Sequence, residues 1–153
     1  MKLTDTQYTI KDFLEVKASF AAGFNSEASK IVYMNNDTGT AQLYAVPREG
    51  GERIQLTDFP DSISGYIYSP TEEKIIFSKS EGGNENAQLY FLDPATREIK
   101  ALTQKKEVRH NLGSFSLDGN YLSYASNERN GKDFDVYLMD AHTFESRCVC
   151  VDD

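Results

Sequence analysis

Long hydrophobic runs are missing from this chain of 153 residues. No apolar stretch approaches the roughly 18 residues that a membrane-spanning helix needs, so no membrane partner is expected. The first ten residues also lack a basic patch followed by a hydrophobic core, which is the pattern of a secretory signal. Together these two absences predict a cytoplasmic location.

Positive charge is in short supply, with 16 Lys and Arg against 24 Asp and Glu and a net charge of −8. The basic residues are scattered, and the densest pair, Lys105-Lys106, runs directly into Glu107. Contacts to phosphate groups need clustered Lys and Arg side chains. Nucleic acid is therefore not expected as a partner, whereas an acidic surface favours solubility.

Cysteine is nearly absent: the sequence contains only Cys148 and Cys150. Both belong to a strand-like segment, where residues two apart point to one face but lie too far apart for relaxed disulfide geometry. A Cys-x-Cys pair alone also lacks the other ligands of a zinc site. The pattern favours reduced, buried structural cysteines, and neither a metal nor another cofactor is expected.

The residues of a hydrolytic site are missing as well. No Gly-x-Ser-x-Gly segment, the nucleophile elbow of serine hydrolases, occurs in the sequence, and the nearest segment, 113–116, lacks the second glycine. The two histidines, His110 and His142, fall near a strand start and in a turn, and both are interpreted as loop or rim residues. Asp118-Gly119 has no run of acidic residues before it, which excludes a calcium loop. No catalytic residue is predicted in this chain.

The sequence does contain an internal repeat, which occurs three times at a spacing of 44 to 47 residues. Each copy has a hydrophobic triplet, a second anchor ending in Tyr, and a third anchor that closes the unit. The triplets are 31–33, 75–77 and 122–124, the second anchors are 42–44, 88–90 and 135–137, and the third anchors are 54–57, 100–103 and 147–150. A repeat of this length made of short strands is the signature of a propeller blade.

The predicted fold is all-β: a partial β-propeller of about three four-stranded antiparallel blades with a short N-terminal segment. The segment is 1–19, with a short helix over 9–16 that Thr9 caps together with Asp12, and the blades are 20–63, 64–109 and 110–153. A single sandwich also suits regular short strands, but the matching of three anchors from copy to copy favours the propeller. Closed propellers have about 4 to 8 blades, so three blades leave two open flanks.

Several segments resemble known families. Segments 69–74 and 116–121 resemble the Ser-Pro-Asp-Gly-Lys turn of TolB-like propeller repeats, although Leu117 replaces the usual Pro. The stretch 42–57 resembles the Gln-Leu-Tyr, Gly-Gly and Leu-Thr signature of the same repeats. The opening 8–14 and the segment 124–137 are similar to prolyl-oligopeptidase-type serine peptidases. The resemblance covers essentially the whole chain.

In that peptidase family, the propeller precedes an α/β-hydrolase domain with a Ser-Asp-His triad and restricts access to short peptides. The resemblance therefore implies a non-catalytic propeller portion, whose partners are the hydrolase domain of the parent chain and a peptide substrate. The alternative is a stand-alone TolB-like protein-binding module, completed by oligomerisation or by a partner. In either case, the open flanks expose strand edges and apolar surface, so the isolated chain is expected to self-associate.

Four polar residues are candidates for contact with a substrate or with the hydrolase domain: Asn127, Glu128, Arg129 and Arg109. The first three belong to the polar loop 127–130, and Arg109 is the last residue of the second blade. A hairpin turn with hydrated charges is the competing interpretation of the loop, and it is the favoured one. For Arg109 the functional interpretation is a rim charge that faces the channel, and a merely hydrated charge is again the favoured one.

Overall fold

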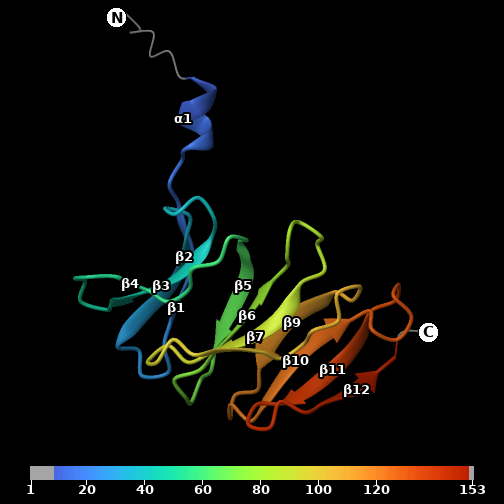
Figure 1. Cartoon of the computed structure of the whole chain (residues 1–153). Helices are drawn as coiled ribbons and strands as arrows, with labels where there is room; N and C mark the ends of the chain where they lie inside the picture. Colours follow the sequence, from blue (N-terminus) through green and yellow to red (C-terminus); the bar gives the residue numbers. More distant parts are fainter. Residues whose placement is uncertain (1–8, 152–153) are drawn as a thin grey trace, which may run out of the picture.

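The computed structural model describes residues 9–151, which form one short helix and twelve strands (Figure 1). Residues 1–8 of the predicted N-terminal segment and 152–153 of the third blade lie outside the described residues. In chain order the elements are α1 (Ile10–Leu14), β1 (Ser19–Phe24), β2 (Lys30–Asn35), β3 (Gln42–Pro47), β4 (Ile54–Gln55), β5 (Ile63–Tyr68), β6 (Ile75–Lys79), β7 (Gln88–Leu92), β8 (Ile99–Ala101), β9 (His110–Phe115), β10 (Tyr121–Ser126), β11 (Asp135–Asp140) and β12 (Ser146–Cys150).

The strands form three separate four-stranded sheets, each antiparallel and built from consecutive strands. We call these sheets unit 1 (β1–β4), unit 2 (β5–β8) and unit 3 (β9–β12). Figure 1 shows them following one another along the molecule, with unit 3 at the C-terminal end. The predicted all-β class and the partial propeller of four-stranded blades are confirmed, and the alternative of a single sandwich is not what the chain forms. The residue limits of the blades remain predictions.

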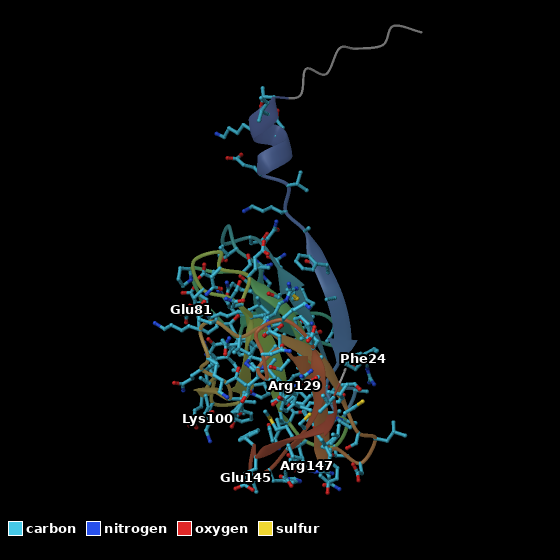
Figure 2. All side chains as sticks on the ribbon, turned by 90° about the vertical axis from the view of Figure 1, so that its right-hand side faces the viewer. Phe24, Glu81, Lys100, Arg129, Glu145 and Arg147 are labelled. Atoms are coloured by element: carbon cyan, nitrogen blue, oxygen red, sulfur yellow. The ribbon has the colours of Figure 1, made fainter. Side chains whose placement is uncertain are left out.

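The helix α1 begins where the sequence predicts it. The Thr9 backbone N–H donates to the Asp12 carboxylate over 2.7 Å, and the Asp12 N–H donates to the Thr9 hydroxyl over 3.3 Å. These bonds satisfy two amide groups that a helix start leaves without partners. The Thr9 N–H and the Thr9 hydroxyl both donate to the Asp12 carboxylate, and these two bonds lower the pKa of Asp12. The helix lies beyond the N-terminal end of β1, apart from the sheets (Figures 1 and 2).

An aromatic pair recurs in each unit and gives the repeat its physical meaning. The two rings face each other across the second and third strands, with centroids 5.2 to 5.9 Å apart and planes within 26° of parallel. Cross-strand aromatic pairs stabilise a sheet beyond the burial of their area. The pairs are Tyr33–Tyr44, Phe77–Tyr90 and Tyr124–Tyr137.

The side of each sheet that carries this pair is its aromatic face, and the opposite side is its aliphatic face. The aromatic face of unit 2 packs against the aliphatic face of unit 1 in one buried cluster, and unit 3 packs on unit 2 in a second. The buried core residues of the first cluster include Val32, Leu43, Ile75, Phe77 and Leu92, and those of the second are Ile76, Leu89, Leu122, Tyr124 and Met139. No described sheet covers the aromatic face of unit 1 or the aliphatic face of unit 3.

A buried amide at the start of the third strand fixes the loop that leads to the next unit. The Gln42 side chain donates to the Phe59 carbonyl and accepts from the Phe59 N–H, both over 3.0 Å. Gln88 donates to the Val108 carbonyl over 2.7 Å and accepts from the Lys105 N–H over 3.1 Å. These glutamines are the first residues of the second anchors found in the sequence. Asp135 occupies the equivalent position in unit 3.

Candidate functional site

The first strand of each unit lies at an edge of its sheet, and these inner strands, β1, β5 and β9, are neighbours in space. Each inner strand carries a register shift where it pairs with the second strand of its own unit. Such bulges bend a strand and re-aim its side chains, and they are common beside functional sites. The inner strands therefore form the surface on which a propeller channel is built.

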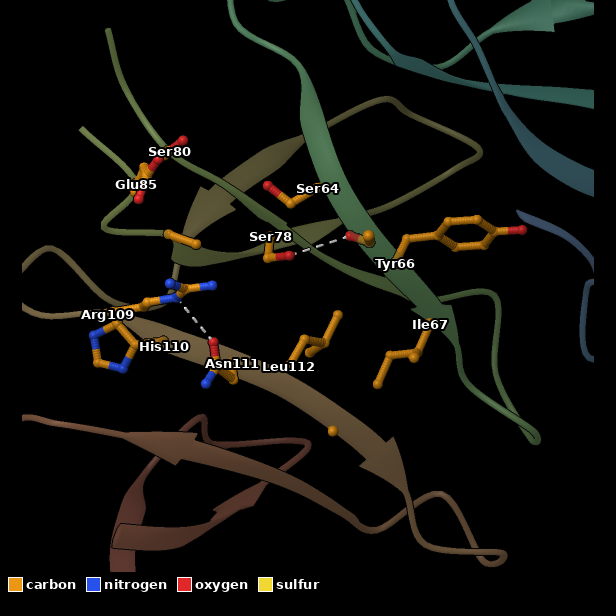
Figure 3. Close-up of a pocket in the computed structure, with 13 residues that line it drawn as sticks. Ser64, Tyr66, Ile67, Ser78, Ser80, Glu85, Arg109, His110, Asn111 and Leu112 are labelled. Carbon is orange, nitrogen blue, oxygen red and sulfur yellow. Dashed lines mark hydrogen bonds between the residues drawn. The ribbon is translucent and has the colours of Figure 1, made fainter. Parts of the chain in front are cut away.

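A cavity of about 670 Å³ lies between β5 and β9 on this surface (Figure 3). Its wall combines hydroxyl and amide groups with two opposite charges and an apolar part. The polar lining residues include Ser64, Ser78, Ser80, Glu85, Arg109 and Asn111, whereas Tyr66, Ile67 and Leu112 contribute apolar surface. A second hollow, of about 500 Å³, lies at the other end of the inner strands and is more apolar.

Arg109 precedes β9 and is held in place at the cavity by two contacts. Its backbone N–H donates to the Asn127 side-chain oxygen over 2.8 Å, and its Nε donates to the Asn111 side-chain oxygen over 3.2 Å. The two terminal amino groups of its guanidinium have no acceptor among residues 9–151. Of the four residues proposed from the sequence, Arg109 is the one that lines this cavity.

His110, beside Arg109, is only 1% exposed, so the interpretation of it as a loop or rim residue is wrong. It is the first residue of β9, and its ring packs edge-on against Tyr124 with centroids 5.8 Å apart. Neither ring nitrogen has a hydrogen-bond partner among the described residues. Burial lowers the pKa of His110 because the charged form loses its hydration; the nearby Glu128 carboxylate opposes this shift.

The buried histidine predicts a stability that depends on pH. The unfolded chain binds a proton at His110 with a pKa of about 6.5, while the folded chain does so only at lower pH, so acid favours the unfolded state. The unfolding free energy should therefore fall as the pH drops below about 6.5, by about 1.4 kcal/mol per unit of pKa depression. Urea unfolding at several pH values measures this slope.

The substitution His110→Leu should remove the slope between pH 6.5 and the folded-state pKa. The matched variant His142→Leu changes an exposed histidine in the β11–β12 turn and should keep the slope. Carboxylates whose pKa is lowered by hydrogen bonds, such as Asp93 and Asp118, act in a more acidic range. Identical pH profiles for the unsubstituted chain and His110→Leu would contradict the assignment.

Asn127 has a structural role that recurs in unit 1. Its side-chain oxygen accepts the N–H of Arg109, just before β9, and Asn36 accepts the N–H of Ala18, just before β1, over 2.7 Å. The Asn127 amide also donates to the Gly131 carbonyl over 3.1 Å, which closes the loop between β10 and β11. Asn127 therefore fixes the start of an inner strand.

The charges of loop 127–130 are paired, which corrects the interpretation of a turn with merely hydrated charges. Glu128 forms an ion pair with Lys105 of unit 2. Arg129 binds the buried Asp135 carboxylate through two contacts, of 2.7 and 3.1 Å. Two-pronged Arg–carboxylate pairs are geometrically specific, so Arg129 holds the loop against its own sheet. Sequence spacing gave no signal for either pairing.

The cysteines are exposed, so their predicted burial is also wrong. They lie on β12, which is the outermost strand of unit 3 and has a neighbour on one side only. A register shift pairs Cys148 with Tyr137 and Cys150 with Val136, which are consecutive residues of β11, so the regular alternation fails here. Among the described residues, no group of three His, Cys, Asp or Glu side chains is arranged to hold a metal ion.

Nor does any helix within residues 9–151 have the length and apolarity to cross a membrane.

Comparisons with known proteins connect this architecture to two groups. No protein-family model matches the chain. An uncharacterised peptidase of Bacillus subtilis, YuxL, is 26% identical over an alignment 162 positions long, which covers 80% of this chain and 24% of the relative. The chain thus spans about a quarter of that protein's length.

Two solved structures carry the comparison of folds. TolB from Acinetobacter baumannii matches with a TM-score of 0.68 and 22% identity, over 86% of this chain and 32% of TolB. A structure from a study of two prolyl endopeptidases matches with a TM-score of 0.61 and 14% identity, over 89% of this chain and 21% of that chain. The chain is therefore a partial β-propeller of the TolB-like type, and its sequence relates it to a peptidase.

Proposed function

We propose that this chain is the non-catalytic propeller portion of a serine peptidase that resembles the prolyl-oligopeptidase family. The observation that carries the proposal is the sequence similarity to about a quarter of a peptidase, in a chain whose fold matches part of a prolyl endopeptidase structure. The sequence contains no Gly-x-Ser-x-Gly segment, and its histidines are one buried and one exposed in a turn. The chemistry would come from an α/β-hydrolase domain of the parent chain.

The role of the propeller would be to control access. In a complete ring of units, the inner strands would border a passage whose width limits what reaches a catalytic domain beside it. A folded protein would be excluded, while a short peptide would pass. A cytoplasmic location fits this role, because short peptides from protein turnover are found there.

The isolated chain should cleave neither peptide nor ester substrates. The reason is chemical: a serine nucleophile needs a base within hydrogen-bond reach, and His110 is buried against Tyr124 with no hydroxyl bonded to it. Release of a fluorophore from short peptides, and of nitrophenol from a simple ester, measures this. Turnover that a serine-directed fluorophosphonate abolishes would contradict the prediction.

The proposal as a whole is tested by the gene downstream of the codon for Asp153. A reading frame that continues through further repeat units to a Gly-x-Ser-x-Gly segment would support the peptidase. In the protein that this frame encodes, hydrolysis should fall steeply as the peptide substrate lengthens. Equal rates for short and long peptides would exclude control of access.

One observation favours a second candidate function, a stand-alone binding module. Units 1 and 3 each present an uncovered face of the kind that is buried between the units. A second copy of the chain, or a partner, would cover these faces and complete a ring. A stop codon directly after Asp153 would favour this function over the peptidase.

A further inference from the structure

We propose that the cavity between β5 and β9 binds a short peptide with free ends, with Arg109 holding its carboxylate and Glu85 its ammonium group. This inference rests on the proposed function, because it names the ligand class that the propeller would hold. It starts from two opposite charges that line one cavity and do not pair with each other.

Two lysines near the cavity already have acidic partners. Lys79 pairs with Glu81 over 3.7 Å, and Lys105 pairs with Glu128. By contrast, Glu85 makes no ion pair within residues 9–151, and the Arg109 guanidinium uses only its Nε, toward Asn111. A planar guanidinium with two free amino groups is suited to a carboxylate, which it binds through two parallel hydrogen bonds. A carboxylate such as that of Glu85 is the matching partner for an ammonium group.

Hydrogen-bonding groups that line the cavity suit a peptide backbone. Ser64 and Ser80 line the cavity, and their hydroxyls bond to no other described residue. The Ser78 hydroxyl has a single long contact, 3.5 Å to the Gly65 carbonyl. Figure 3 shows Ser64 and Ser78 across the cavity from Arg109 and Asn111. Hydroxyl groups both donate and accept, so they match the alternating N–H and C=O groups of a peptide.

His110 adds an independent observation. It lines the same cavity and is almost fully buried, yet both of its ring nitrogens lack a partner in the described part of the chain. Buried polar atoms in native proteins are nearly always hydrogen-bonded. The ring packs on Tyr124 and also borders a second hollow, which Glu128 lines as well. His110 therefore places an unsatisfied polar group at the start of β9, beside Arg109, and the assignment of the ligand rests on the charges and hydroxyls of the cavity.

The size of the cavity restricts the ligand to a short peptide. Its volume of about 670 Å³ falls within the range of roughly 300–1,000 Å³ that small-molecule sites occupy. Tyr66, Ile67 and Leu112 provide apolar surface for one or two small side chains. A cavity of this volume holds a few residues of a peptide and not a folded protein.

Calorimetric titration with trialanine, N-acetyl-trialanine and trialanine amide tests the proposal. Trialanine should bind, and either cap should weaken binding roughly tenfold, because each removes one charge-assisted contact. In Arg109→Gln, the free and amidated peptides should bind equally; in Glu85→Gln, the free and acetylated peptides should. The matched controls Arg97→Gln and Glu98→Gln change exposed charges that do not line the cavity and should behave as the unsubstituted chain does.

The possible outcomes separate this inference from the proposed function. If trialanine does not bind, or if capped and free peptides bind equally, the site is not the one described, even where the gene encodes a hydrolase domain. If each cap weakens binding, and the matching substitution at Arg109 or Glu85 removes that effect, the peptide site is supported. If the gene also ends after Asp153, the peptide site remains supported while the proposal of a peptidase fails. Circular dichroism of each variant shows whether a lost affinity reflects a lost fold.

Discussion

In solution, two copies of the chain are expected to associate head to tail, with the aliphatic face of unit 3 against the aromatic face of unit 1. The prediction follows from how the units already pack: the aromatic face of each later unit covers the aliphatic face of the unit before it. One face of each kind is left uncovered within the chain. Those two faces are therefore complementary by the same rule that holds the chain together.

Equivalent positions show what the open faces lack. Val136 of unit 3 stands where units 1 and 2 have Leu43 and Leu89; these two are 0% exposed, whereas Val136 is 42% exposed. On the aromatic side, the cross-strand pair Ile31–Val46 stands where the later units have the buried pairs Ile75–Leu92 and Leu122–Met139. Apolar residues in a repeated interface position are thus left partly exposed at both ends.

Two copies have the right number of units for closure. Each copy contributes three, so two contribute six, which is within the roughly 4 to 8 blades of closed propellers. A two-fold axis then makes both contacts identical, and no open face remains. Closed symmetric assemblies of this kind are the usual outcome when two faces are complementary.

The substitutions Val136→Glu and Val46→Glu should each give a monomer. A carboxylate inside an apolar contact loses its hydration with no partner, so the dissociation constant should rise at least about a hundredfold. Sedimentation velocity across a range of concentrations measures the change. Ile99→Glu is the matched control, because Ile99 is an exposed apolar residue of β8 outside both open faces.

Mixing the two variants tests the head-to-tail arrangement itself. Each variant keeps one intact face, and the intact faces are of opposite kind, so an equimolar mixture should form a complex of one copy of each. Contact between two unit 3 faces would instead leave Val46→Glu dimeric on its own. A monodisperse monomer of the unsubstituted chain would contradict both the open faces and the repeat assignment.

The strands could be predicted from the sequence because their causes are local. Short apolar runs bounded by turn residues, such as 43–46 and 89–92, are typical of strands that are buried on both faces. Turn residues such as Asp118-Gly119 then set where each strand ends, and Gly119 adopts a φ of +74° that favours glycine. The same anchors recur three times, so the number of sheets could be predicted as well.

The burial of individual side chains was harder to predict from the sequence, because it depends on which face of a unit another unit covers. His110 has a polar ring that suggests a rim position, yet it lies where unit 3 packs against unit 2. Cys148 and Cys150 look like core residues, yet they lie on β12, the edge strand of the last unit. The position of a unit in the array, rather than its own sequence, decides both cases.

The candidate site could be predicted from the sequence only in part, because it too depends on how the units pack. Arg109 directly precedes the inner strand β9, whose start the repeat predicts, and it lines the cavity. Glu85 was not predicted as a site residue. It lies in a turn of unit 2, and the cavity that it lines exists only because β5 packs beside β9. The partner of Arg129 is Asp135, and no periodicity links the two.

Adding a single methyl group to the inner strand of unit 3 should substantially lower the free energy of unfolding of the chain. In Gly113→Ala, the new Cβ would lie 2.5 Å from the Ser123 carbonyl oxygen and 2.7 Å from the Ser123 hydroxyl. The first of these atoms belongs to the backbone of β10 and gives way only if the strands separate at the bulge. The expected loss is about 2–3 kcal/mol of unfolding free energy, measured by urea denaturation.

The inner strands of the other two units supply matched controls, Gly23→Ala and Gly65→Ala. The nearest atoms to a new Cβ there are the Tyr66 hydroxyl at 3.5 Å and the Ser78 hydroxyl at 4.0 Å, both at ordinary contact distance. Alanine also restricts the unfolded chain, so these variants should change stability by less than about 1 kcal/mol in either direction. Equal losses in all three would mean that each bulge needs glycine for its backbone conformation. A loss confined to Gly113 would show that contact with β10 decides the residue, and that β9 lies closest to its own sheet where it borders the cavity.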